Sequence, residues 1–188
     1  GTTDGNAANN STPVATLGAA LNGVYTAGGA SPDFTGPKQA ADQISAGGVL
    51  GPVTINIRPG TYTENIYLSN PPGNVAQRPI TFQSEDGNKN TCLVTFAGGA
   101  TQTAAINATS VTGGIPTLRI NNTDYVTFKN FTIQATGTGG SNWAVAVELM
   151  GLSTNANDGC DNDVFDNMVF TGRTSTSFIL NDIVFLSN

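Results

Sequence analysis

The sequence predicts an all-β protein, a parallel β-helix in which successive turns of the chain stack on one another, with a short N-terminal capping α-helix. The first observation is the segment 60–68, Gly-Thr-Tyr-Thr-Glu-Asn-Ile-Tyr-Leu, which follows a helix-like segment and an alternating strand at 53–59. The second is a series of short strands, closed by Gly, Asn, Asp or Pro, that runs to the C-terminus. The third is that no helical pattern separates these strands, which excludes a βαβ arrangement.

Residues 1–22 are rich in Ala, Asn, Thr and Gly, and we expect them to form a linker or an added N-terminal strand. Residues 23–188 are expected to form one parallel β-helix domain, because stacked turns share a single core. A short first strand is predicted at 24–26. The chain ends in mid-pattern after the apolar run 183–186, so we expect a fragment of a longer protein or an open C-terminal end.

A short amphipathic helix is predicted at 37–46. Pro37 suits the first helical turn, and the Gly pair at 47–48 suits the stop. Phe34, Ala41 and Ile44, together with Ala40, fall on one face at helical spacing. We expect this face to cover the open end of the column. The alternative is an independent binding helix.

From residue 53 onward the apolar residues alternate with polar ones, which indicates strands with one buried face. Each alternating run is three to six residues long. The predicted inward-facing sets are Val53, Ile55 and Ile57; Ile80 and Phe82; Leu118 and Ile120; Val126 and Phe128; Phe131 and Ile133; and Val145, Val147 and Leu149.

Two weak repeats indicate the length of one turn. Val126, Val145, Val164 and Ile183 recur every 19 residues, close to the length of one repeat in many solenoids. The second repeat aligns residues 126–133 with 163–170, which implies a different spacing. Both cannot hold strictly, but each predicts stacked turns.

The second repeat places Asn130 over Asn167, and Asn188 is a candidate for the next position. Asn tolerates a left-handed backbone at a corner, and its amide can bond to the Asn of the next turn. We therefore predict a structural Asn ladder of Asn130, Asn167 and Asn188.

Composition excludes several classes of function. Charged residues are only 11% of the 188, and the net charge is −6 with seven Lys and Arg. Such a chain cannot build a phosphate-tracking surface, so no nucleic-acid partner is expected. No segment is long and apolar enough for membrane insertion. The absence of His removes the commonest general base and most zinc sites, which leaves carboxylates, Lys and Arg for any catalysis.

The two cysteines, Cys92 and Cys160, allow at most one disulfide. A bridge between nearby turns is one alternative. We favour two ordinary core or corner thiols, because neither lies in a cluster typical of a metal site or a nucleophile.

The sequence resembles the pectin-lyase-like superfamily, and this resemblance implies a right-handed, single-stranded parallel β-helix. Its style is most similar to the β-helix segments of very large secreted surface proteins of the Bacteroidetes type. The resemblance covers about residues 23–188 and is specific for fold rather than activity. The segments that carry it are 33–34, 40–41, 53–58 and 60–66 for the superfamily, and 23–26, 47–53 and 124–133 for the surface proteins.

The catalytic residues of the pectin methylesterases, which share the Gly-Thr-Tyr-x-Glu-Asn motif, are not matched. The segment 143–147 stands where that family has a Gln-Ala-Val-Ala-Leu-like strand. The segment 173–176 stands where it has Gln-Asp-Thr-Leu, whose Asp is a catalytic acid. Without the Gln and Asp there is no general acid and no oxyanion donor, so we expect no catalytic residue of this type.

One acidic cluster is a candidate calcium site: Asp158, Asp161, Asp163 and Asp166 crowd hard oxygen ligands into one turn. The plainer interpretation is a solvated turn whose carboxylates cap backbone groups. Polysaccharide lyases of the resembled fold use an Arg or Lys base with calcium, and Arg173 lies nearby. A surface Arg, however, more often forms a salt bridge.

Two further features are candidates for contact with a glycan. Trp143, the only Trp, could stack on a sugar from an exposed loop, although packing within the protein is the plainer role. Glu64, beside Asn65, would need a second carboxylate on the same face for catalysis, and Glu85 with Asp86 after the next strand are the candidates.

These observations predict a non-catalytic structural or adhesive module of a secreted, extracellular or cell-surface bacterial protein, with self-association as a fibre subunit left open. The expected partners are other copies of the chain, neighbouring modules of a larger chain, or a glycan, and no cofactor is expected apart from the candidate calcium. Residues 12–21 are the candidate donor of an added strand. The alternatives are a carbohydrate-active enzyme, either lyase or esterase-like, and an ice- or glycan-binding surface. The spaced Thr pairs at 61/63, 101/103 and 174/176 do not recur at the spacing of one turn, so a flat Thr ladder is not expected.

Overall fold

A computed structural model describes residues 18–97, 116–136, 145–151, 159–172 and 184–187. This part of the chain is mostly parallel β-sheet, with one short α-helix. The all-β character expected from the sequence is therefore confirmed at this level.

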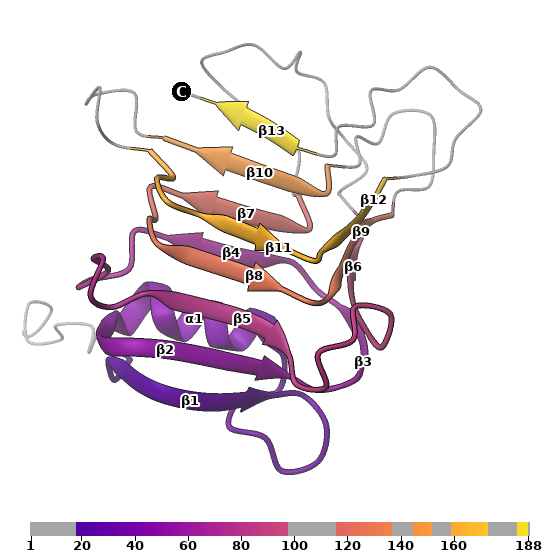
Figure 1. The fold of residues 1–188 in the computed structure, drawn as a ribbon, viewed down its shortest axis with the longest axis horizontal. Helices are drawn as coiled ribbons and strands as arrows, with labels where there is room; N and C mark the ends of the chain where they lie inside the picture. Colours follow the sequence, from indigo (N-terminus) through magenta and orange to yellow (C-terminus); the bar gives the residue numbers. More distant parts are fainter. Residues whose placement is uncertain (1–17, 98–115, 137–144, 152–158, 173–183, 188) are drawn as a thin grey trace, which may run out of the picture.

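The described strands form three sheets, which we call A, B and C (Figure 1). Every pairing between these strands is parallel. Sheet A contains β1 (Leu21–Ala27), β2 (Val49–Ile57), β5 (Ile80–Ser84), β8 (Val126–Lys129) and β11 (Val164–Asp166). Sheet B contains β3 (Gly60–Thr63), β6 (Cys92–Phe96), β9 (Thr132–Ala135) and β12 (Val169–Thr171). Sheet C contains β4 (Ile66–Ser69), β7 (Leu118–Asn121), β10 (Val147–Met150) and β13 (Val184–Ser187).

From β2 onward the chain passes through sheets A, B and C in turn. Three consecutive strands, one from each sheet, therefore form a layer, and the first layer is β2–β3–β4. Each strand pairs with the corresponding strand of the next layer, so the layers stack as Figure 1 shows. Because the pairing is in register, alternate side chains of every strand face the space between the sheets.

This inner space is filled by apolar side chains from all three sheets. The ring of Phe128 stacks on Phe82 and on Phe165, with 5.5 Å between centroids in both pairs. Aromatic rings of sheet A thus form one column through three successive layers. The other fully buried large side chains are Ile44, Ile55, Ile57, Ile66, Leu68, Ile80, Leu118, Ile120, Phe131 and Ile133.

The helix α1 (Pro37–Gly47) begins and ends close to the predicted positions. Pro37 occupies the first turn, and Gly48 ends the helix with a φ of 78°, a conformation that glycine adopts without strain. Ala41 and Ile44 are buried, and the helix packs against β4, β1 and β2. Among the described residues, no helix has the length and apolarity needed to cross a membrane.

Phe34 lies before the helix rather than on its face. Its backbone forms a parallel bridge with Ala27 of β1, and its half-buried ring lies 5.8 Å from that of Tyr25. The helix begins only after Gly36, because the backbone of Phe34 is already bonded to β1. Phe34 packs against the edge of the core from this position.

The 19-residue repeat is wrong. Val164 pairs with Thr127 instead of Val126. An offset of one residue turns a side chain to the opposite face of the sheet. Accordingly Val126 is buried, whereas Val164 is 47% exposed. The second alignment describes the register, since β12 pairs with β9 through Val169–Thr132.

Asn residues turn the chain at two corners between strands. Asn130 and Asn167 both have a left-handed backbone, with φ values of 59° and 51°. The amide of Asn167 donates a hydrogen bond of 2.8 Å to the amide oxygen of Asn130. Asn70 and Asn122 occupy a second corner with φ values of 40° and 45°. Asn188 lies outside the described residues.

Candidate functional site

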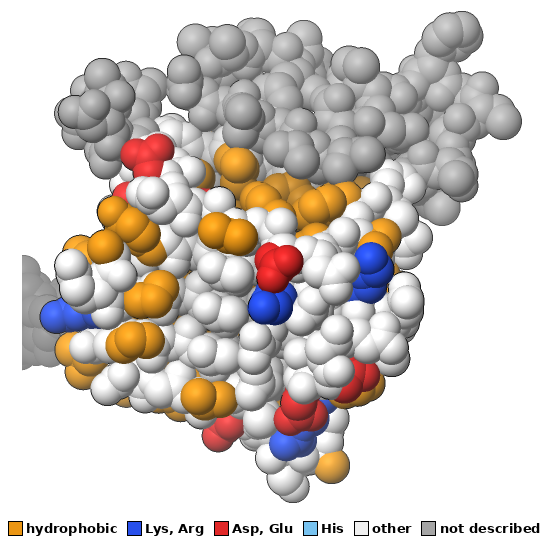
Figure 2. Space-filling model, viewed as in Figure 1, with side chains coloured by type: hydrophobic (Ala, Val, Ile, Leu, Met, Phe, Trp, Pro, Cys, Tyr) orange, Lys and Arg blue, Asp and Glu red, His pale blue; other side chains and the backbone are white. Residues whose placement is uncertain are grey.

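The outer face of sheet A carries two rows of side chains that run across all five strands. Figure 2 views the molecule from this side and shows few charged groups on it. The residues that we call the Thr row are Val24, Thr54, Thr81, Thr127 and Val164. The residues that we call the polar row are Thr26, Asn56, Gln83, Lys129 and Asp166.

The Thr row is a ladder that the sequence analysis did not expect. Thr54, Thr81 and Thr127 are paired in register on adjacent strands, flanked by β-branched Val24 and Val164. The layers insert different numbers of residues between these threonines, so no constant spacing marks them in the sequence. Of the predicted Thr pairs, Thr61 and Thr63 are exposed on β3, and the others lie outside the described residues.

The polar row is held together by its own side-chain bonds. Gln83 donates a 2.9 Å hydrogen bond to the amide oxygen of Asn56. Lys129 Nζ lies 3.2 Å from the carboxylate of Asp166. The charges of Lys129 and Asp166 offset each other, so the two rows present mainly hydroxyl, amide and methyl groups with little net charge.

The outer face of sheet C carries the most buried charge among the described residues. Tyr67, Arg119 and Glu148 lie side by side on β4, β7 and β10. Glu148 is 1% exposed, and one of its carboxylate oxygens pairs with Arg119 Nε. The guanidinium of Arg119 lies 5.6 Å from the ring centroid of Tyr67, within cation–π range.

Burial raises the pKa of Glu148, although the charge of Arg119 lowers it. The second carboxylate oxygen of Glu148 is buried and has no hydrogen-bond partner among the described residues. Such a perturbed carboxylate beside a cation is a candidate functional group. This pair is not apparent from the sequence, because the β7–β10 register that brings the two residues together is not visible in either strand alone.

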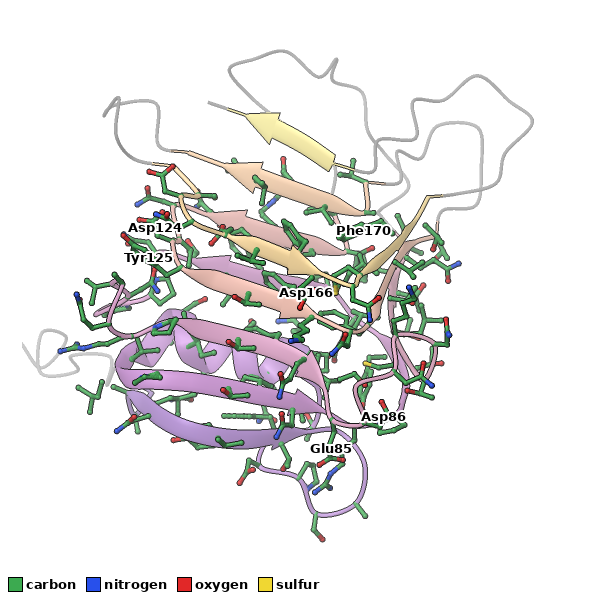
Figure 3. The ribbon with its side chains drawn as sticks, in the orientation of Figure 1. Glu85, Asp86, Asp124, Tyr125, Asp166 and Phe170 are labelled. Atoms are coloured by element: carbon green, nitrogen blue, oxygen red, sulfur yellow. The ribbon has the colours of Figure 1, made fainter. Side chains whose placement is uncertain are left out.

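The predicted acidic cluster divides into two parts. Asp166 lies in the polar row, bonded to Lys129, whereas Asp161 and Asp163 lie at the turn before β11. Asp124, from the turn before β8, joins Asp161 and Asp163 to form what we call the Asp corner. Figure 3 labels Asp124 at this corner and Asp166 at a distance from it.

The Asp corner binds backbone groups of adjacent layers. Asp124 accepts a 2.8 Å hydrogen bond from the N–H of Asp161, and Asp163 accepts one of 2.8 Å from the N–H of Val126. Asn74, one layer below, accepts the N–H of Asp124 at 3.0 Å. These contacts connect the turns of three successive layers. They agree with the plainer interpretation of the acidic cluster, in which carboxylates cap backbone N–H groups.

Asp163 is the unusual member of the corner. Burial, together with the charges of Asp124 and Asp161, raises its pKa to about 7. Asp163 can therefore exchange a proton near neutral pH. Within the described part of the chain, no group of three or more Asp, Glu, Cys or His residues is placed to hold a metal ion. Asp158 lies outside that part, as does Trp143.

The other predicted carboxylates each serve a local structure. Glu64 accepts a 2.7 Å hydrogen bond from the N–H of Lys38 at the start of α1, and burial raises its pKa. Glu85 pairs with Arg58. Asp86 accepts bonds from Ser84, Asn88 and Thr91 within one turn, which lowers its pKa. Glu64 and the Glu85–Asp86 pair are thus committed to different partners.

Both cysteines are free thiols, as the sequence analysis favoured. Cys92 faces the core on β6, where burial raises its pKa to about 12. Cys160 is half-buried and lies 3.4 Å from the carbonyl oxygens of Ile120 and Met150. A thiol in such surroundings is a poor nucleophile.

Comparison of the chain with protein-family models, with curated proteins and with solved structures finds no match.

Proposed function

We propose that the chain is a right-handed, single-stranded parallel β-helix that serves as a rigid, non-catalytic structural or adhesive module of a secreted or cell-surface protein. The observation that carries this proposal is that nine of its carboxylates bond to the protein's own backbone N–H groups or to its Lys and Arg side chains. Five of them accept hydrogen bonds from backbone N–H groups: Asp33, Glu64, Asp86, Asp124 and Asp163. Four others pair with Lys or Arg: Asp42, Glu85, Glu148 and Asp166.

Hydrolysis of a glycan by the common mechanism needs two carboxylates that face each other across the sugar. The nine carboxylates just named are instead distributed over turns, a helix end and sheet faces. Apart from the Asp42–Lys38 pair within α1, each bond joins segments that are distant in sequence or fixes a turn or loop. This distribution favours a role of the carboxylates in rigidity over a role in catalysis. A spacer or a display module requires such a rigid structure.

The surface supports an adhesive role. The Thr row and the polar row form a continuous face across five strands, and a face held by in-register strands changes little on binding. Hydroxyl and amide groups on such a face can bond to the hydroxyls of a neutral glycan. The low charge content of 11% fits an extracellular surface hydrated mainly by hydroxyls and amides.

A carbohydrate-active enzyme is the second candidate, and one observation favours it. Glu148 combines burial, a raised pKa and a neighbouring Arg119, which is the kind of environment that tunes a general acid. Glu148 would act as the acid, and Arg119 would position it or stabilise developing negative charge.

A polysaccharide panel distinguishes the two candidates. The purified chain is incubated with soluble and insoluble glycans, with and without calcium, and both co-sedimentation and released sugar are measured. We expect retention on at least one glycan without released product. Loss of retention in a Thr81→Glu variant, with Thr63→Glu on sheet B as the control, would locate binding on the Thr row. Product release that disappears in Glu148→Gln would replace the structural proposal with the enzymatic one.

A further inference from the structure

We propose that sheets A and C are closed against strand addition at the α1 end of the molecule, so that a β-strand of a second copy cannot extend sheet A at β1 or sheet C at β4. An exposed strand edge presents unpaired N–H and C=O groups to any other strand, and proteins commonly block such edges. β1 and β4 are the outermost strands of their sheets at this end. Both edges are blocked by bonds from the chain itself.

The register of β1 shows which of its groups face outward. Ala27 pairs with Ile57, and the carbonyl of Ala27 accepts the N–H of Arg58. Odd-numbered residues of β1 therefore direct their backbone groups toward β2. In a parallel pair the even-numbered residues Asn22, Val24 and Thr26 direct theirs away from the sheet.

A side-chain hydroxyl occupies the first of these positions. The N–H of Asn22 donates to the hydroxyl oxygen of Tyr25 at 3.3 Å, and the same hydroxyl donates to the carbonyl of Asn22 at 3.2 Å. One group thus satisfies both outward backbone groups of Asn22. The ring of Tyr25 is held in place by its contact with Phe34.

The following loop folds back over the other end of the same edge. The N–H of Phe34 donates to the carbonyl of Thr26 at 3.0 Å, and the N–H of Gly28 donates to the carbonyl of Phe34 at 2.9 Å. Asp33 accepts both the N–H and the hydroxyl of Thr26 at 2.8 Å. Arg58 fixes the loop from the side by donating to the carbonyl of Ala30.

β1 therefore keeps one outward position, Val24, between two blocked ones. Strand addition needs several consecutive outward groups, because a ladder with a single residue is not stable. The left-handed backbones of Gly28, Gly29 and Ser31 let the loop return sharply enough to reach Thr26.

β4 is blocked in the same way by α1. Its even-numbered residues bond to β7, as the N–H of Ile66 donates to the carbonyl of Thr117. The outward groups belong to Tyr67 and Ser69. The hydroxyl of Ser45 on α1 donates to the carbonyl of Tyr67 at 3.4 Å and accepts the N–H of Ser69 at 3.2 Å.

The hydroxyls of Tyr25 and Ser45, the carboxylate of Asp33 and the backbone of Phe34 thus take the place of a strand partner at Asn22, at Thr26, at the carbonyl of Tyr67 and at the N–H of Ser69. Open head-to-tail fibres need two complementary ends on every subunit. A chain whose sheets A and C are closed at one end cannot form such a fibre by extending these two sheets. Strand addition between copies in sheets A and C would then use only the opposite edges, at β11 and β13, and would end with a pair of copies.

Amide hydrogen exchange of the native chain tests the proposal directly. We expect the amides of Asn22, Thr26 and Ser69 to exchange at least tenfold more slowly than the same residues in unstructured peptides, at concentrations where light scattering shows a monomer. Unprotected exchange at these three amides in the monomer would overturn the proposal.

Variants test the consequence for association. Tyr25→Phe combined with Asp33→Ala gives the opened variant, in which the outward groups of Asn22 and the N–H of Thr26 lose their partners. The backbone bond of Phe34 to the carbonyl of Thr26 remains, and the phenyl ring preserves the contact with Phe34. Asp42→Ala is the control, because it also removes one negative charge, in this case from α1. It leaves the bonds at the β1 and β4 edges intact. We expect the opened variant to associate at a concentration at least tenfold lower than the native chain and Asp42→Ala, as measured by light scattering after size-exclusion chromatography.

Circular dichroism identifies whether the opened variant is folded. A folded variant with fast exchange at Thr26 but native association behaviour would refute the proposal. If the double variant fails to fold, Tyr25→Phe alone takes its place, since it removes only the hydroxyl that bonds Asn22. This test does not depend on the proposed adhesive role, because association and glycan binding are measured separately.

Discussion

At the level of single residues, carboxylates in this chain mainly replace missing partners for backbone N–H groups. Asp33, Asp124 and Asp163 each accept such a group from a different segment. A hydrogen bond to an ionised acceptor is stronger than one between neutral groups. Asp163 is different, because burial and two neighbouring carboxylates oppose its ionisation.

We predict that Asp163→Asn stabilises the fold at neutral and alkaline pH. The pKa of Asp163 is about 7 in the folded chain, against an ordinary value of 3.8. Between these two values the unfolded chain loses the proton first, so ionisation costs stability as pH rises, and the cost is complete above about pH 7. Asn removes the charge and keeps an oxygen that can accept the N–H of Val126. We expect a gain of about 1–2 kcal/mol at pH 8 and little change at pH 4, because part of the desolvation cost is relieved by solvent.

Urea unfolding at pH 4 and pH 8 measures this difference. Asp166→Asn is the matched control, because Asp166 pairs with Lys129 on the surface and its loss should change stability by less than about 1 kcal/mol. Equal effects of Asp163→Asn at both pH values would show that ionisation of this group does not limit stability.

The residues of the candidate sites were only partly predictable. Asp161 and Asp163 stand out in the sequence because they are close together, and both lie in the Asp corner. Glu148 and Arg119 do not stand out, since each is a single charged residue in a short strand. Their pairing depends on the parallel register of β7 and β10, which is set by the whole stack of layers.

At the level of elements, α1 is stabilised at its N-terminus from outside the helix. Gly36 at the cap position has no side chain to accept the free N–H groups of the first turn. Glu64, between β3 and β4, supplies the missing acceptor to Lys38. The helix and the first layer are therefore coupled by one carboxylate.

We predict that Glu64→Ala destabilises the protein by about 1–2 kcal/mol, the usual cost of losing an N-cap acceptor. Gly36→Ser in the Glu64→Ala background should restore part of this loss, because Ser can cap the helix itself. In the native background the same substitution should not help, since a Cβ on Gly36 would lie 2.7 Å from a carboxylate oxygen of Glu64. Thermal unfolding of the four chains measures the coupling. A stabilising effect of Gly36→Ser beside an intact Glu64 would contradict this account.

The elements differed in how clearly the sequence indicated them. β2, β5, β7, β8, β9 and β10 all coincide with predicted alternating runs, because the inward face of each is apolar apart from Ser84 at the end of β5. The helix was visible from Pro37 and the Gly pair that ends it. β6 is not evident from the sequence, since Cys is a weak strand signal and the apolar Leu93 interrupts the alternation of apolar and polar residues. Phe34 was placed on the helix because spacing alone does not show where the first backbone bond begins.

At the scale of the whole molecule, the repeat is not visible in the sequence because the layers contain different numbers of residues. The loops between strands vary in length, so partners in adjacent layers are separated by different numbers of residues, as for Val53–Ile80 and Ile80–Val126. A fixed period is therefore a poor guide, and the 19-residue spacing gave the wrong register. The local match of 126–133 to 163–170 succeeded because it compares two strands and the corner between them.

The stacked rings of Phe82, Phe128 and Phe165 connect three layers, so the position of a lost ring should decide how far the damage spreads. We predict that Phe128→Ala costs about 3–5 kcal/mol, because the residue is fully buried and its removal leaves a cavity between two layers. Phe165→Ala should cost about half as much, since Phe165 is only partly buried and has one stacked neighbour.

In a stack where each layer contacts only its neighbours, loss of the central ring should also weaken the coupling between the two halves. Hydrogen exchange should then show β11 and β12 opening independently of β2 and β5 in Phe128→Ala, whereas Phe165→Ala leaves the protection of β2 and β5 unchanged. Uniform loss of protection across all layers in both variants would mean that the stack unfolds as a single unit and that the rings do not set its internal coupling.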